Sequence, residues 1–197
     1  MSSTKTDLTQ HVHAERERLA GLLAGLTDEQ WDHPSLCTGW RVREVLAHTT
    51  MPFRTNPAKF MVGLASAGFS FNRYADRAAR RDAARMSAAD LLASLRSNIA
   101  NPWQPPGGGL AGALSHDTIH GLDITEPLGL PAAPVERIAL VLANTNPRGL
   151  AFFGVDLTGI QLRGTDADVR VGEGEPVDLP VKDILLTITG RRRTGRG

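Results

Sequence analysis

The stretch ALSHDTIHGLDI, residues 113–124, carries two histidines four positions apart in an otherwise largely apolar segment. Residues at this spacing lie on neighbouring turns of one helix face, with Cβ atoms about 5–6 Å apart. The imidazoles of His116 and His120 can therefore both reach one metal ion at roughly 2.0–2.1 Å. The same spacing also suits a buried hydrogen-bonded network without a metal, and the pair alone leaves both interpretations open.

A catalytic zinc-type site needs three protein ligands and one open position. Among the remaining histidines, His48 is the best third ligand, because it flanks the apolar stripe within residues 42–46 of a different helix. The histidines at positions 11, 13 and 33 are predicted to be solvated. The sequence therefore predicts a metal site formed by His48, His116 and His120.

Two aspartates accompany the histidine pair. Asp123 follows His120 by three residues on the same face, where its carboxylate can accept the free ring N–H of a ligating histidine. A hydrogen bond at the helix end or to a loop is the alternative role for Asp123. Asp117 makes HDTIH similar to the H-E-x-x-H of zinc peptidases, but it is one methylene shorter than the glutamate that acts there as general base. We interpret Asp117 as a surface group or as a residue that supports a ligand.

Apolar spacing and capping patterns predict a mainly α-helical fold. The helices are expected over residues 7–25, 40–50 (ended by Pro52), 57–85 with a break near Gly68, 91–100, 110–125 and 135–144. Capping boxes are expected at Thr27 and Ser87. Residues 159–179 alternate apolar and polar side chains between glycine turns, which indicates strands, and a short apolar helix follows. We expect an antiparallel four-helix bundle in residues 1–150 and a small β-containing C-terminal element in residues 151–197.

Composition narrows the class of protein. The chain has 197 residues, 41% hydrophobic and 22% charged, which is typical of a globular protein. A formal net charge of +1 argues against a nucleic-acid or membrane-surface partner. The single cysteine, Cys37, excludes an internal disulfide and favours a reducing compartment. Because no signal peptide or membrane span is evident, we expect a cytoplasmic protein; its oligomeric state is not indicated.

Two segments, LTDEQWDHPSLCTGWRVREVLAHTT (26–50) and IHGLDITEPLG (119–129), resemble signatures of the mycothiol-dependent maleylpyruvate isomerase family, part of the DinB/YfiT-like metalloenzyme superfamily. Residues 165–177 resemble its C-terminal extension, which ends early here and is expected to be incomplete. The resemblance implies a DinB-like four-helix bundle that holds a divalent metal, usually zinc or nickel, through His48, His116 and His120. Family members often carry a carboxylate at the position of His116, so an all-histidine set makes this site more positive.

The resemblance also implies a function. It predicts a metal-dependent transferase or isomerase in which mycothiol, a low-molecular-weight thiol, adds to a small electrophilic substrate. A metal at the site would lower the pKa of a thiol or water at its open position. Two alternatives stay open, a metal-dependent hydrolase that uses metal-bound hydroxide and a non-catalytic metal-binding bundle. Arg191 is a candidate for binding a substrate carboxylate, with a basic tail as its other interpretation.

Overall fold

The computed structural model describes residues 2–145, 151 and 153–192. The chain forms two compact units, Met1–Leu130 and Pro131–Gly197. A boundary at residue 150, as expected from the sequence, would place α8 (Val135–Ala143) in the first unit. Helix α8 instead packs against α10 (Val181–Ile188) and belongs with the second unit.

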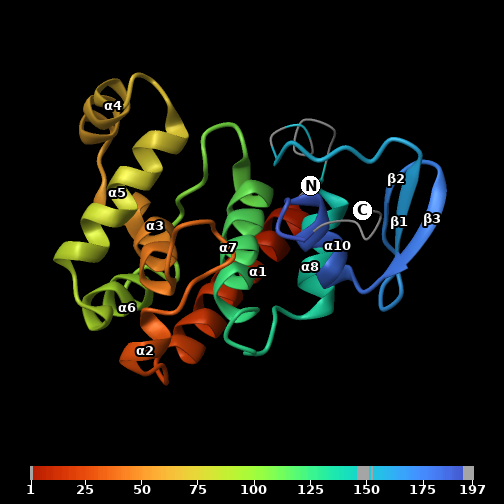
Figure 1. Cartoon of the computed structure of the whole chain (residues 1–197), viewed down its shortest axis with the longest axis horizontal. Coiled ribbons are helices and arrows are strands. Elements are labelled where there is room, and N and C mark those ends of the chain that lie inside the picture. Colours follow the sequence, from red (N-terminus) through yellow and green to blue (C-terminus); the bar gives the residue numbers. More distant parts are fainter. Residues whose placement is uncertain (1, 146–150, 152, 193–197) are drawn as a thin grey trace. The chain divides into compact units, whose positions relative to one another are not determined.

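Four helices of the first unit form a bundle (Figure 1). Its members are α1 (Ser2–Leu23), α3 (Val42–Arg54), α6 (Ala88–Arg96) and α7 (Gly109–Thr125). Helices α1 and α3 each pack against both α6 and α7, so the four contacts form a ring. Outside this ring, α5 (Phe71–Arg85) packs on α3, α4 (Pro57–Ser66) packs on α5, and the short α2 (Asp28–Trp31) contacts α3. The mainly helical fold predicted from the sequence is confirmed.

Local sequence signals mark several helix boundaries. Thr27 and Gln30 form the predicted capping box of α2, in which the Gln30 amide donates to Thr27 Oγ1 at 3.3 Å. Ser87 and Asp90 do the same for α6. Between α4 and α5 the backbone adopts a positive φ of 63° at Gly68, a conformation that glycine adopts without a steric penalty. The break near Gly68 is therefore confirmed.

The predicted end of α3 at Pro52 is wrong, because the helix continues to Arg54. Proline cannot donate the backbone hydrogen bond to the residue four before it. Pro52 lies in the last turn of α3, so this loss affects one bond only. In the same turn the Arg54 guanidinium donates to the Ala47 carbonyl at 3.1 Å and to Thr50 Oγ1 at 2.6 Å. These donors stabilise the carboxyl end of the helix.

An apolar core holds α3 beside the other helices of the first unit. Its fully buried members include Leu46 of α3, Leu91 of α6 and Ile124 of α7. Fully burying a side chain of this size contributes about 1.5–3 kcal/mol relative to leaving it exposed. This packing fixes the position of His48 in the middle of α3.

The second unit contains a small sheet. Its strands are β1 (Ile160–Gly164), β2 (Arg170–Gly172) and β3 (Glu175–Leu179), in the order β2-β1-β3. Strand β1 pairs antiparallel with β2, where Leu162 faces Val171, and parallel with β3, where Leu162 faces Val177. Helix α10 packs on β1. The strands and the final helix lie where the sequence predicted them. Within the described residues, every helix is too short or too polar to cross a membrane.

Candidate metal centre

Three histidine side chains meet inside the helical bundle. His48 comes from α3, and His116 and His120 come from successive turns of α7. One ligand nitrogen from each of the three lies within 4.8 Å of the others. The ring centroids are 5.4 Å apart for His48 and His116 and 4.8 Å apart for each of the other two pairs. The structure thus brings together the three residues named from the sequence.

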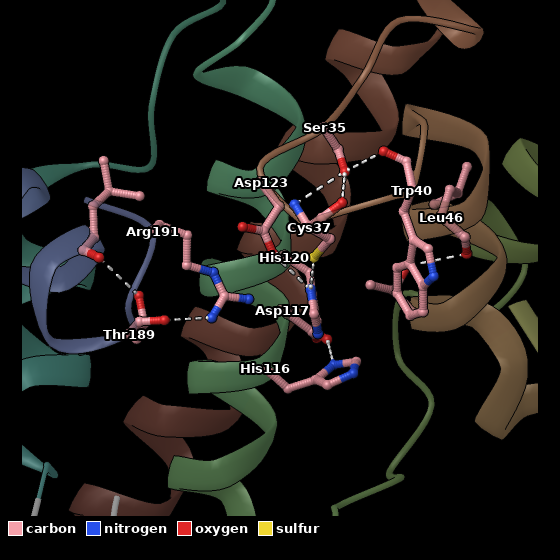
Figure 2. Close-up of polar contacts among 12 residues, drawn as sticks. Ser35, Cys37, Trp40, Leu46, His116, Asp117, His120, Asp123, Thr189 and Arg191 are labelled. Atoms are coloured by element: carbon pink, nitrogen blue, oxygen red, sulfur yellow. Dashed lines mark hydrogen bonds and ion pairs between the residues drawn. The ribbon is translucent and has the colours of Figure 1, made fainter. Parts of the chain in front are cut away.

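His120 is held by Asp123, which follows it by one turn of α7 (Figure 2). Its Nδ1 lies 2.9 Å from Asp123 Oδ2, and the Asp123 residue is fully buried. An ionised carboxylate only accepts hydrogen bonds, so Nδ1 of the imidazole is the donor. In the neutral imidazole the proton on Nδ1 places the lone pair on Nε2, which is the nitrogen that can then bind a metal.

His116 has a corresponding partner in the adjacent residue. Its Nδ1 lies 3.0 Å from Oδ1 of Asp117 (Figure 2). The other carboxylate oxygen of Asp117 accepts from Arg16 Nε of α1 at 2.7 Å. Both Arg16 and Asp117 are buried. Of the two sequence interpretations of Asp117, the surface one is therefore wrong.

His48 is the most enclosed of the three imidazoles, with 7% of the residue exposed. Burial lowers the pKa of His48 well below its ordinary value of 6.5, and the neighbouring His120 and His116 lower it further, against a smaller raising effect of Asp123. The neutral imidazole, which is the ligating form, is therefore favoured. Its Nδ1 is buried and has no hydrogen-bond partner in the part of the chain that the structure describes.

Cys37 lies beside this cluster, in the loop between α2 and α3. Its thiol donates to Asp123 Oδ2 at 3.0 Å, and its sulfur lies 3.9 Å from Nδ1 of His120. The backbone amide of Leu36 also donates to the Asp123 carbonyl at 3.0 Å. The loop is thereby fixed to α7 at the position of the histidines.

Two tryptophans flank the imidazoles. The Trp40 ring centroid lies 5.2 Å from that of His48, and the Trp103 centroid lies 5.3 Å from that of His116. Neither ring is predicted from the sequence to lie at the site. The indole Nε1 of Trp40 donates to Asp76 at 2.8 Å, which fixes the side chain. Trp103 lies in a loop before α7, where no periodic pattern could have assigned it a neighbour.

Two of the other histidines lie outside this cluster. His33 is exposed, with Nδ1 2.8 Å from the Pro34 carbonyl, and His11 pairs with Asp7 at 3.3 Å. Arg191 belongs to the second unit, where its Nη1 donates to the Thr189 carbonyl at 2.8 Å and its guanidinium carbon lies 5.5 Å from the Phe153 ring centroid.

Parts of the chain are similar to known proteins. Residues 12–101 match the sequence profile described as "Mycothiol maleylpyruvate isomerase N-terminal domain". The chain has no match among curated proteins. Among solved structures, it aligns with a crystal structure of mycothiol-dependent maleylpyruvate isomerase that carries a histidine-to-alanine substitution. That alignment has a TM-score of 0.49 and 15% identity, and it covers 95% of this chain and 89% of the other.

Proposed function

We propose, on the premise that residues 12–101 belong to the mycothiol maleylpyruvate isomerase N-terminal domain family, that this protein is a metal-dependent transferase or isomerase. Its substrate would be a small electrophilic molecule, and its second reactant a low-molecular-weight thiol such as mycothiol. The observation that carries the proposal is the convergence of three imidazoles, two of which each contact a carboxylate of the same helix through Nδ1.

The donor set fits a divalent transition metal. Three neutral imidazoles suit zinc and nickel, and three protein ligands leave a coordination position for a reactant. His48, His116 and His120 would hold the ion, while Asp117 and Asp123 orient two of the rings. The buried Nδ1 of His48, without a partner among the described residues, supports a function for this ring beyond packing.

The charge of the site favours an anionic reactant. A bound divalent ion would act as a Lewis acid and lower the pKa of a thiol, so that the nucleophilic thiolate is present near neutral pH. Because the three histidines are neutral ligands, they offset none of the positive charge of the ion. The flanking rings of Trp40 and Trp103 provide apolar surface beside the imidazoles.

The test is an activity screen with protein purified without a histidine tag and loaded with zinc or nickel. Electrophilic substrates are assayed with and without mycothiol, beside a panel of simple esters and amides. We expect turnover that requires both metal and thiol, that is lost in His120→Ala and that is kept in His33→Ala. Ester or amide cleavage without thiol, lost in His120→Ala, would instead assign a hydrolase. Full metal content without turnover of any substrate would assign a non-catalytic metal-binding bundle.

A further inference from the structure

We infer that Arg16 and Asp117 form a buried positioning pair that selects the metal-binding nitrogen of His116. This inference rests on the proposed metal centre and deepens it. Only 1% of the Arg16 side chain and 8% of the Asp117 side chain are exposed, and their Nε and Oδ2 atoms lie 2.7 Å apart. The second oxygen of Asp117 lies 3.0 Å from Nδ1 of His116. A continuous polar chain therefore runs from α1 to the imidazole.

The guanidinium of Arg16 is fixed by contacts other than Asp117. Its Nη1 donates to the carbonyls of Asn101 at 2.7 Å, Ile99 at 3.3 Å and Asn98 at 3.4 Å. Its central carbon lies 5.1 Å from the ring centroid of Phe53. Since an arginine side chain keeps its positive charge at any physiological pH, Asp117 faces an immobile cation. A buried ion pair held in this way constrains the orientation of the carboxylate.

This orientation determines which nitrogen of His116 carries the proton. A carboxylate has two acceptor oxygens and no donor, and Arg16 occupies one of them. The remaining oxygen faces Nδ1 of His116, so Nδ1 must be the protonated nitrogen in the neutral ring. The lone pair then lies on Nε2. Asp117 thus gives His116 the tautomer that Asp123 gives His120, and both histidines present the same nitrogen to a metal.

Gly121 lies where α1 approaches α7. A Cβ atom at this position would lie 2.9 Å from Oε1 of the buried Glu15, the residue before Arg16. The absence of a side chain at Gly121 therefore leaves room for the Glu15 carboxylate, which pairs with Arg18 at 2.6 Å.

The experiment measures the affinity of the full-length protein for Zn²⁺ and Co²⁺ by chelator competition. Asparagine at position 117 has one acceptor oxygen, so either Arg16 or His116 loses its acceptor. If the amide faces Nδ1, the proton moves to Nε2 and blocks metal binding there. We expect Asp117→Asn to lower the affinity for both metals by about 10–100-fold. It should also change the visible absorption spectrum of the Co²⁺ protein. Asp117→Glu keeps two acceptor oxygens and should restore part of the affinity.

Thr118→Val is the matched control. Thr118 is the next residue of α7, is fully buried, and its hydroxyl has no hydrogen-bond partner within the described ranges. Valine has nearly the same shape, so both metal affinity and the Co²⁺ spectrum should match the wild type. Should Asp117→Asn fail to fold, Arg16→Lys provides the second test, because it keeps the charge but not the geometry of the guanidinium. We expect about tenfold weaker metal binding in Arg16→Lys.

Two results would overturn the inference in different ways. A lower melting temperature of metal-free Asp117→Asn, with wild-type metal affinity and an unchanged Co²⁺ spectrum, would show that the pair only stabilises the fold. Wild-type protein that binds neither Zn²⁺ nor Co²⁺ would overturn the proposed metal centre itself and this inference with it. The first result appears only in the variant and the second already in the wild type, so the two failures are distinguishable.

Discussion

Asp123 Oδ2 lies 2.9 Å from Nδ1 of His120, and the same oxygen accepts the thiol hydrogen of Cys37 at 3.0 Å. The residue is fully buried in α7. Its carboxylate thus connects the imidazole to the loop that precedes α3. This contact supports the interpretation that Asp123 orients the imidazole of His120.

We predict that Asp123→Asn still binds a metal ion but with about 10–100-fold lower affinity, because a neutral amide oxygen is a weaker acceptor for His120 and Cys37 than the carboxylate oxygen that both donors share. Chelator competition on the purified variant measures the change. Thr118→Val, a buried substitution on the same helix, serves again as the control. A metal-bound crystal structure with an Asp123 oxygen at bonding distance from the ion would show that Asp123 is itself a ligand.

The lowered pKa of His48 predicts a pH dependence of stability in the metal-free protein. Unfolding returns His48 to an ordinary pKa near 6.5, whereas burial together with His120 and His116 lowers the pKa in the folded chain, against the opposing charge of Asp123. Between these two pKa values the unfolded state binds more protons, so the free energy of unfolding decreases as pH falls below about 6.5. Above that pH the His48 imidazole is neutral in both states, so its titration no longer lowers the free energy of unfolding.

Thermal unfolding between pH 5 and 8, with a chelator present, tests this prediction. In His48→Gln the side chain no longer titrates, so part of the loss of stability at acidic pH should disappear. His33→Gln, at an exposed histidine, should keep the wild-type dependence. An identical pH dependence in His48→Gln and the wild type would contradict the assignment.

Substitution by alanine is expected to have opposite effects on protein stability at two glycines. Gly121 lies where α1 approaches α7, and an added Cβ would be 2.9 Å from Glu15 Oε1. We predict that Gly121→Ala destabilises the protein by about 1–3 kcal/mol, as overpacking typically does. Gly21 lies within α1, and no atom of the described residues lies within 4 Å of an added Cβ there. Gly21→Ala should stabilise the protein by about 0.5–1 kcal/mol. Urea unfolding of both variants measures the difference, and equal effects would argue against a close contact at Gly121.

Local features of the sequence were sufficient for much of the fold. The capping boxes at Thr27 and Ser87 involve side chains three residues apart, so their geometry depends on the immediate chain alone. The spacing of His116 and His120 likewise determines that their rings share one helix face. The helix end predicted at Pro52 is wrong because a proline near a helix end removes only one backbone hydrogen bond. The sequence does not show whether another donor supports that turn.

The features of the site that could not be predicted from the sequence depend on contacts between residues far apart in the chain. The partner of Arg16 is Asp117, 101 residues further along the chain. A signal for the burial of Arg16 was present, since Val12 and Leu19 lie four residues before and three residues after it on one helix face. Its run of charged neighbours made this segment resemble a solvated surface. The proximity of Trp103 to His116 depends on a loop conformation that no periodicity encodes.

The most direct test of the metal centre is elemental analysis of protein purified without a histidine tag. We predict about one divalent transition-metal ion per chain, as three converging histidine ligands imply. His48→Ala, His116→Ala and His120→Ala should each lose most of the metal, while His33→Ala should keep it because that side chain is exposed and outside the cluster. Metal content in His120→Ala equal to that of the wild type would contradict the assignment of the site.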